Sequence, residues 1–317
     1  MLSNLRIFMK VIYGSGRLPR SFKRSVVAIG VFDSVHVGHQ NVIRRAVLEA
    51  RRLKCVSVVL TFDPHPVSVL RPKEFSSYVL TLEHRLKLIA ALGVDYCVVL
   101  RFNTRMARQS PEKFIHDILM KRLHAQKVLV GKDFHFGCKG VGNIAFLRAE
   151  GRRLGFDVEA VPIFKLNNIN IKTNIIKGLI REGKLSLLKR FLGRDHSFLA
   201  EVVGGDKRGR RLGYPTANLK KENVTILPSG IYCARVLWRA KKLNALLYIG
   251  TRKTFYARNT HVVLEVFILD FHQDIYGQDI DVLVLKKIRD DAAFSDGESL
   301  ALQIQRDVAA AQKYFTR

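Results

Sequence analysis

Residues 25–39 decide the fold of the first half of the chain, and they read SVVAIGVFDSVHVGH. Residues 25–32 are apolar and mostly β-branched until Asp33, which is typical of a short strand buried on both faces. From residue 38 to residue 53 apolar side chains recur at helical spacing. The stretch therefore predicts a buried strand that leads, through a short polar loop, directly into a helix.

The same alternation of strand and helix continues to about residue 130. Further strands are expected at residues 8–13, 56–62, 94–100 and 127–130, and helices at residues 81–92 and 111–123. In the last of these helices Ser110 is the expected N-cap and Pro111 takes the first helical position. This order predicts an α/β domain with a parallel, Rossmann-like sheet, which binds ligands at the carboxyl ends of its strands.

After about residue 190 the pattern changes to short strands separated by turns. Strands are expected at residues 197–203, 230–238, 244–249, 262–271 and 278–288, and one helix at residues 298–314. This pattern predicts a small antiparallel β-barrel with a C-terminal helix. The 317 residues thus divide into two domains, 1–189 and 190–317.

Charge is the unusual feature of the composition. The net charge is +27, and residues 1–189 hold 33 Lys/Arg against 13 Asp/Glu. A positive field attracts nucleic acid, acidic membranes or phosphorylated small molecules. No run of five or more Lys/Arg occurs, so a basic solvated surface is favoured and no nucleic-acid partner is expected.

The cysteines, the absence of long apolar stretches and the N-terminal residues indicate where in the cell the protein works. Cys55, Cys97, Cys138 and Cys233 lie far apart, so they form neither a disulfide framework nor a zinc knuckle. No stretch approaches the ~20 apolar residues of a membrane span. A cytoplasmic protein without membrane contact is expected, and the oligomeric state is left open. Residues 1–24 are rich in Arg and Ser, like a transit peptide, but a first strand is favoured because a domain begins directly afterwards.

The junction of the first strand and helix has the chemistry of a phosphate site. His36 and His39 flank Gly38 at the start of the helix. A helix N-terminus offers unpaired N–H groups and a positive dipole end, and Gly38 lets the backbone approach a phosphate. The histidines can donate charge-assisted hydrogen bonds to phosphate oxygens. A metal site is the alternative, but no third ligand lies nearby in sequence.

A second candidate site begins with GRRLGYPTAN, residues 209–218. Its glycines allow a tight loop, its arginines face anions, and Thr216 and Asn218 offer oxygens to Mg²⁺ and phosphate. A basic surface turn is the alternative. Downstream, Glu265 stands alone in an apolar strand, where a carboxylate is costly unless it has a task or a partner.

These strings resemble the bacterial bifunctional riboflavin kinase/FAD synthetase family. The first resembles its G-x-F-D-x-x-H-x-G-H signature, and the second resembles the G-R-x-x-G-(F/Y)-P-T-A-N motif of riboflavin kinases. Residues 61–66, TFDPHP, and 131–137, GKDFHFG, resemble two further motifs of the family. Departures occur at Ser34 and Gly140, and at residues 171–177, where the family's I-S-S-T-x-I-R reads IKTNIIK and Lys177 replaces Arg. Arg and Lys are not equivalent at a phosphate site.

The resemblance implies an enzyme that phosphorylates riboflavin to FMN with ATP and Mg²⁺, and adenylylates FMN to FAD with a second ATP. The alternative is a riboflavin kinase whose adenylyltransferase domain is weak or inactive. The implied catalytic residues are Glu265 as general base, and His36, His39 and Lys177 as charge-bearing groups. The implied ATP and phosphate contacts are Gly30, Phe32, Asp33, Gly38, Asp133, Gly209, Arg210, Gly213, Pro215, Thr216 and Asn218. Thr216 and Asn218 would hold the metal. The implied flavin contacts are Phe62, Pro64, His65, Pro66, Arg289 and Phe294.

Overall fold

The computed structural model describes residues 9–16, 18–19, 22–166, 168–205, 213–220, 222–253 and 260–316. The chain forms two compact units. The first comprises residues 1–76 and 82–173, and the second comprises residues 77–81 and 174–317. We describe each unit by itself.

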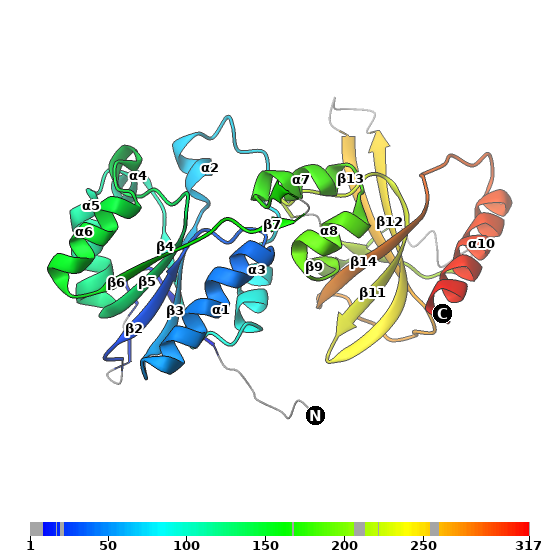
Figure 1. Cartoon of the computed structure of the whole chain (residues 1–317). Coiled ribbons are helices and arrows are strands. Elements are labelled where there is room, and N and C mark those ends of the chain that lie inside the picture. The colour runs from blue at the N-terminus through cyan, green and yellow to red at the C-terminus, as the bar shows by residue number, and fades with distance from the viewer. Residues whose placement is uncertain are drawn as a thin grey trace. The chain divides into compact units, whose positions relative to one another are not determined.

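The first unit is built on a six-stranded parallel sheet, as the sequence predicts (Figure 1). The strand order is β1-β4-β3-β2-β5-β6. The strands are β1 (Lys10–Tyr13), β2 (Ser25–Ile29), β3 (Val56–Asp63), β4 (Tyr96–Arg101), β5 (Ala125–Gly131) and β6 (Asp157–Val161). The expected first strand is thus present over Lys10–Tyr13, and residue 8 lies outside the described residues. β6 was not predicted, because its Asp157 and Glu159 interrupt the apolar pattern.

Helices cover both faces of this sheet. They are α1 (Val37–Arg52), α2 (Pro66–Leu70), α3 (Leu82–Ala90), α4 (Thr104–Ala107), α5 (Pro111–Phe114), the π-helix η1 (Ile115–Arg122), the 3₁₀-helix η2 (Cys138–Gly140) and α6 (Ile144–Leu154). A short hairpin follows, β7 (Lys165–Leu166) and β8 (Ile169–Asn170). Figure 1 shows α1 and α3 on one face of the sheet and α5 and α6 on the other. Two-sided burial explains why β2 is apolar after Ser25 and why only Ser57 and Thr61 interrupt the apolar run from Val56 to Phe62 in β3.

The second unit is a closed antiparallel barrel, also as predicted. Its strand order is β10-β13-β12-β11-β14-β9. The strands are β9 (His196–Val203), β10 (Ala217–Leu219), β11 (Gly230–Trp238), β12 (Lys241–Lys253), β13 (Thr260–Ile268) and β14 (Asp279–Arg289). β10 was not predicted, yet it pairs with both β9 and β13 and so closes the barrel.

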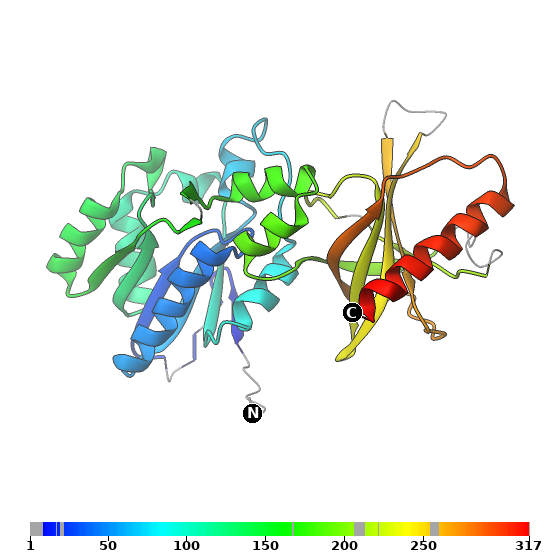
Figure 2. The same ribbon diagram turned by 45° about the vertical axis from the view of Figure 1, so that its right-hand side comes forward.

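A C-terminal helix, α10 (Gly297–Phe315), lies along the outside of the barrel (Figure 2). Asp296 is its N-cap, and the Asp296 carboxylate accepts a hydrogen bond from the backbone N–H of Ser299 at 2.7 Å. The helix packs on β11, β12 and β14. Cys233, Leu246 and Ala311 are the buried centre of this contact, so the outer face of these strands belongs to a second core.

Two further helices, α7 (Thr173–Arg181) and α8 (Leu185–Leu192), precede the barrel. The compact units divide between Thr173 and Asn174, whereas the sequence pattern placed the boundary between residues 189 and 190. The difference arises because α8 packs on β9 and β14 and buries Leu188, Phe191 and Leu192 completely. Strand-rich patterning marks where the barrel begins, but not which helices pack against it.

The second unit also includes a short segment from the first half of the sequence, Ser77–Thr81. Thr225 donates its backbone N–H to the carbonyl of Tyr78 at 2.7 Å, and the hydroxyls of Ser77 and Thr225 are 2.7 Å apart. Tyr78 and Val224 form an isolated parallel bridge. The chain therefore passes between the two units at three points.

Candidate active sites

The first candidate site is a cavity of about 680 Å³ at the carboxyl ends of the strands in the sheet unit. The chain adds β3 on one side of β2 and later adds β5 on the other. Such a reversal of strand order opens a crevice in which α/β proteins bind ligands. Of the predicted site residues, the cavity is lined by Gly30, Phe32, His39, Phe62, Pro66 and Asp133.

The two histidines of the first motif have different positions at the start of α1. His36 is the N-cap, and its Nδ1 accepts a hydrogen bond from the backbone N–H of His39 at 3.1 Å. Because Nδ1 is an acceptor, the proton of a neutral His36 ring is on Nε2. The two imidazoles stack with centroids 3.6 Å apart, and His39 lines the cavity. His36 itself is buried.

Phe32 explains why a glycine stands at position 30. A Cβ on Gly30 would lie 2.7 Å from the Phe32 ring, which therefore rests directly on the backbone. Phe32 has a φ of 54°, in the left-handed region, and its ring meets His39 edge to face at 5.3 Å. Asp33 is buried in the same loop. Gly38 is also crowded, because a Cβ there would come within 3.1 Å of the His36 ring.

The predicted flavin contacts of this unit are divided between the cavity and its edge. Phe62 and Pro66 line the cavity, while Pro64 follows a cis peptide bond after Asp63. His65 is the N-cap of α2, where its Nδ1 accepts from the backbone N–H of Val67 at 3.1 Å. These residues end β3 and begin α2, so the motif shapes one wall of the cavity.

The two lysines of residues 171–177, the segment that departs from the family's I-S-S-T-x-I-R, lie in different units. Lys172 pairs with Asp133 across 3.7 Å at the cavity of the sheet unit. Lys177 belongs to the barrel unit, is 9% exposed, and its ammonium donates a hydrogen bond to the backbone carbonyl of Ser77. The role predicted for Lys177 in phosphate binding stays a prediction.

Arg85 is a buried residue that the sequence analysis missed. It projects from α3, its side chain is 1% exposed, and it donates to the carbonyls of Val31 at 3.0 Å and Phe62 at 3.1 Å. No sequence motif singled it out, because an Arg on a predicted amphipathic helix is normally solvated. Only its position four residues before Ile89, on the same face of the helix, could have drawn attention to it.

The second candidate site lies on the outside of the barrel, beneath α10. It is a cavity of about 320 Å³. Its wall combines strand residues, one face of α10 and the segments that precede β10 and follow β14. The lining residues are Tyr214, Thr216, Ile231, Leu246, Tyr248, Glu265, Phe267, Arg289, Asp291, Ala292, Phe294, Leu300, Ile304 and Asp307. Four predicted residues, Thr216, Glu265, Arg289 and Phe294, are thereby brought together although 78 positions separate the first from the last.

Thr216 is a hydrogen-bond partner of the lone carboxylate. The Thr216 hydroxyl donates to Oε2 of Glu265 at 2.9 Å. Asn218 on β10 lies opposite Glu265 on β13 in the strand register, so both side chains leave the same face of the barrel wall. A hydroxyl, an amide and a carboxylate thus stand next to one another.

Arg289 is held by a carboxylate that the sequence analysis also missed. Its Nε and Nη2 donate to the two carboxylate oxygens of Asp307 at 2.9 and 2.8 Å, and its guanidinium lies 5.8 Å from the centre of the Phe294 ring. Gln303 donates to the same carboxylate at 3.0 Å. Asp307 shares a helical stripe with Leu300, Ile304 and Ala311, and a buried acid in such a stripe is a signal that could have revealed the pair.

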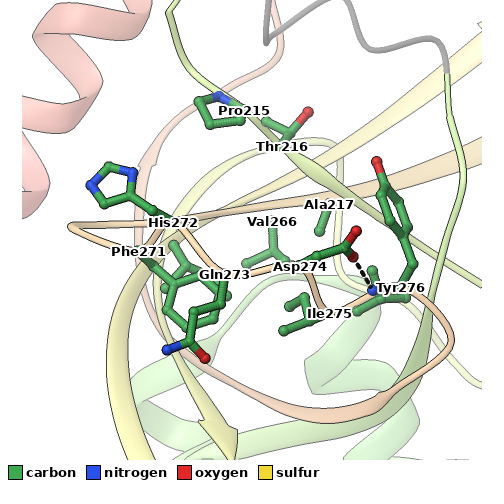
Figure 3. Close-up of a pocket in the computed structure, with 12 residues that line it drawn as sticks. Pro215, Thr216, Ala217, Val266, Phe271, His272, Gln273, Asp274, Ile275 and Tyr276 are labelled. Atoms are coloured by element: carbon green, nitrogen blue, oxygen red, sulfur yellow. Dashed lines mark hydrogen bonds between the residues drawn. The ribbon is translucent and has the colours of Figure 1, made fainter.

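A third cavity, of about 250 Å³, opens on the other face of β13 (Figure 3). Val266 and Ile268 reach it, whereas Glu265 and Phe267 face the outer cavity, as the alternation of a strand requires. Figure 3 shows residues 215–217 facing the loop 271–276, in which the carboxylate of Asp274 accepts from the backbone N–H of Tyr276 at 2.9 Å. Thr216 lines both cavities.

Three residues of the predicted phosphate loop remain to be placed. Gly209 and Arg210 lie outside the described residues, and Gly213 has a φ of 83° that favours glycine.

Within the described ranges, no group of three or more His, Cys, Asp or Glu side chains could hold a metal ion. The oxygens of Thr216, Asn218 and Glu265 do fit Mg²⁺, which accepts few protein ligands and completes its shell with phosphate and water.

Two further observations concern the chain as a whole. Cys55, Cys97, Cys138 and Cys233 are free thiols in the structure. None of the helices in the described part of the chain combines the length and the apolar character that a membrane span requires.

Known protein families match the two halves of the chain separately. The FAD synthetase family matches residues 18–175, and the riboflavin kinase family matches residues 192–315. Curated bifunctional riboflavin kinase/FMN adenylyltransferases are similar over 97% of this chain: one from Buchnera aphidicola subsp. Schizaphis graminum is 33% identical over 99% of its length, and one from Escherichia coli K12 is 32% identical over 98%. The crystal structure of a macrolide-efflux protein from Streptococcus pneumoniae has a TM-score of 0.83 at 28% identity, covering 96% of this chain and 99% of that one.

A parallel sheet with a helix N-terminus at its ligand cavity, followed by a barrel with a paired hydroxyl and carboxylate, defines a two-site enzyme for nucleotidyl and phosphoryl transfer. The chain belongs to the family of bifunctional riboflavin kinase/FMN adenylyltransferases. It carries both domains of that family, and no finding favours the alternative of a kinase alone.

Proposed function

We propose that the barrel unit transfers the γ-phosphoryl group of ATP to the 5′-hydroxyl of riboflavin, with Glu265 as general base. The observation that carries this assignment is the hydrogen bond of Thr216 to Glu265, at the residue that lines both cavities of the unit. The hydroxyl oxygen forms a bond to the γ-phosphorus, the bond to the bridging oxygen of ADP breaks, and Glu265 accepts the proton.

The two cavities of the barrel unit suit two different substrates. The outer cavity is mostly apolar and is bordered by Phe267, Phe294 and Arg289, so it fits the flat ring of a flavin. The inner cavity lies against Pro215 and Thr216, which follow residues 209–213 in the sequence. We assign it to the nucleotide, with Gly209, Arg210 and Gly213 near the phosphates. The γ-phosphate would then meet the flavin hydroxyl at Thr216.

Magnesium has suitable ligands at the same point. Thr216 and Asn218 would hold it, beside the Glu265 carboxylate. When bound, Mg²⁺ offsets the negative charge of the phosphates. Thr216 and Asn218 have the further task of keeping the nucleotide oriented toward Glu265.

In the sheet unit we assign the cavity to ATP and FMN. An oxygen of the FMN phosphate attacks the α-phosphorus of ATP, and pyrophosphate leaves. The N–H groups at the start of α1, together with Gly38, would receive phosphate oxygens, and His36 and His39 would donate to the charge that develops. We place Gly30, Phe32, Asp33 and Asp133 on the nucleotide side and Phe62, Pro64, His65 and Pro66 on the flavin side.

A product analysis tests both assignments at once. Purified protein receives riboflavin, ATP and Mg²⁺ in one sample, and FMN, ATP and Mg²⁺ in a second. Chromatography should resolve FMN and FAD in the first sample and FAD in the second. If the first sample forms FMN and neither sample forms FAD, the protein is a kinase alone. If no FMN and no FAD are formed, the proposed function is overturned.

Two other properties of the molecule stay predictions, namely a cytoplasmic location and the absence of a nucleic-acid partner, and the oligomeric state is left open. Binding to DNA or RNA at physiological salt is the measurement for the second of these, because electrostatic binding of nucleic acid weakens steeply with salt. Tight binding there would contradict the prediction.

A further inference from the structure

The hydrogen-bonded ladder between β2 and β3 stops just before the adenylyltransferase cavity. Ile29 and Leu60 are the last register pair, and the N–H of Gly30 still donates to the Leu60 carbonyl at 3.1 Å. Beyond this point the two strand ends are joined by side chains. The Val31 carbonyl accepts from the Thr61 hydroxyl at 2.9 Å and from the Arg85 guanidinium at 3.0 Å.

Arg85 connects the two strand ends directly. Its Nη1 donates to Val31 at the end of β2, and its Nη2 donates to the Phe62 carbonyl at the end of β3 at 3.1 Å. The same Nη2 lies 3.7 Å from a carboxylate oxygen of Asp63. The planar guanidinium fixes both donors in one rigid fork, which a flexible ammonium group does not provide.

The burial of this arginine is unusual and calls for a reason. The side chain is 1% exposed, and arginine stays charged in proteins. A buried charge is costly unless it is paired and hydrogen-bonded, and hydrophobic packing is often as stable. The carbonyls that Arg85 satisfies belong to Val31 and Phe62, and both of these residues line the cavity.

The segment after Val31 is held in an uncommon conformation. Phe32 has a positive φ, which a residue with a side chain adopts only when its surroundings impose it. Fixing the carbonyl that precedes Phe32 fixes the peptide plane on which this conformation depends. Phe32 then places its ring against His39, at the proposed phosphate end of the cavity.

We propose that Arg85 is a positioning residue for adenylyl transfer, which sets the separation between the nucleotide side and the flavin side of the cavity. Phe32, His39 and Phe62 all line the cavity. In the proposed function, Phe32 and His39 belong to the nucleotide side and Phe62 to the flavin side. Arg85 acts through the Val31 and Phe62 carbonyls and touches neither substrate. This proposal rests on the proposed function of the sheet unit.

The test compares Arg85→Lys and Arg85→Met in the full chain. Initial rates of FAD formation are measured with FMN, ATP and Mg²⁺, below the temperature at which each variant unfolds. A misplacement of about 1 Å between reacting groups can cost about a hundredfold in rate. We expect kcat to fall about a hundredfold in Arg85→Met and about tenfold in Arg85→Lys, which keeps the charge without the fork.

Two controls separate positioning from simple loss of stability. Leu86→Ala on the same helix removes buried apolar contacts without touching either carbonyl, so it should lower the unfolding temperature but leave kcat within about twofold of the parent. Riboflavin phosphorylation by the barrel unit should stay within about twofold of the parent in every variant.

The outcomes are distinct. If Arg85→Lys forms FAD at the parent kcat, or if Leu86→Ala loses as much kcat as Arg85→Lys, the proposal is overturned. If Arg85→Met fails to fold, the kcat of Arg85→Lys for FAD formation decides whether the proposal holds. A parent chain that forms no FAD from FMN would overturn the proposed function, and this inference with it, whereas normal FAD formation in both parent and Arg85→Lys would overturn this inference only.

Discussion

The hydroxyl of Thr216 donates to Oε2 of Glu265 across 2.9 Å, and this contact fixes the orientation of the carboxylate on β13. It joins residues that are 49 positions apart in the sequence, through the antiparallel pairing of β10 and β13. An oriented carboxylate beside a cavity is poised to accept a proton from a bound hydroxyl.

Glu265→Gln should therefore abolish most riboflavin phosphorylation without unfolding the barrel. The glutamine amide can still meet the Thr216 hydroxyl, which accepts as well as donates. Loss of the base should lower the rate on the order of 10²–10⁴-fold. FMN formation is measured by chromatography, with FAD formation from supplied FMN as the internal control. Phosphorylation at near the parent rate would show that Glu265 is not the base.

His36→Asn separates two roles of the first histidine. Asparagine is a good N-cap, so it can replace the contact of His36 Nδ1 with the N–H of His39 and preserve α1. It lacks the Nε2 donor that we assign to transition-state charge, whose removal typically costs about 10²–10³-fold. We expect FAD formation to fall by that factor while the unfolding temperature changes little. A stable variant with unchanged FAD formation would reduce His36 to a helix cap.

The position of the domain boundary can be tested with two truncated chains. Residues 174–317 keep α7 and α8, whereas residues 190–317 begin inside α8 and lack Leu188. Removal of one fully buried leucine typically costs about 2–5 kcal/mol. Both chains should phosphorylate riboflavin if they fold, but the shorter one should unfold at clearly lower denaturant concentration. Trp238 in β11 is the single tryptophan, so its fluorescence reports on the barrel alone. Equal midpoints would show that α8 contributes nothing.

His196 should make the barrel sensitive to acid. Burial, assisted by the nearby positive charge of Arg194, lowers the pKa of His196 from 6.5 to about 3. The folded state keeps the ring neutral, whereas the unfolded chain takes up a proton below about pH 6.5, so stability falls as the pH drops from 6.5 toward 3. The loss from this group approaches about 1.4 kcal/mol per pH unit in that window.

A His196→Gln variant provides the comparison. Its free energy of unfolding, followed by Trp238 fluorescence in denaturant, should depend less steeply on pH between 6.5 and 3 than that of the parent. Carboxylates contribute equally to both proteins and cancel in the difference. Parallel pH profiles would contradict the assignment of this sensitivity to His196.

The fold was predictable where periodicity is strong. The apolar run of β2, the N-cap at Ser110 and the alternation along β11 and β14 all follow from local sequence. β10 escaped prediction because it has three residues, and only pairing with distant strands makes it a strand. Arg85 and Asp307 escaped for a related reason: each is buried against an atom far away in sequence, and the apolar stripe around it indicates burial at most, never the partner.

The inclusion of Ser77–Thr81 in the barrel unit has a consequence for the order of events during synthesis. The ribosome adds about 5–20 residues per second, and N-terminal domains generally fold first. The sheet unit is thus complete several seconds before Thr225, the partner of Ser77 and Tyr78, has been made. Until then water must satisfy the polar groups of this segment, so the nascent chain passes through a stage in which an early-made part of the second unit still lacks its partner.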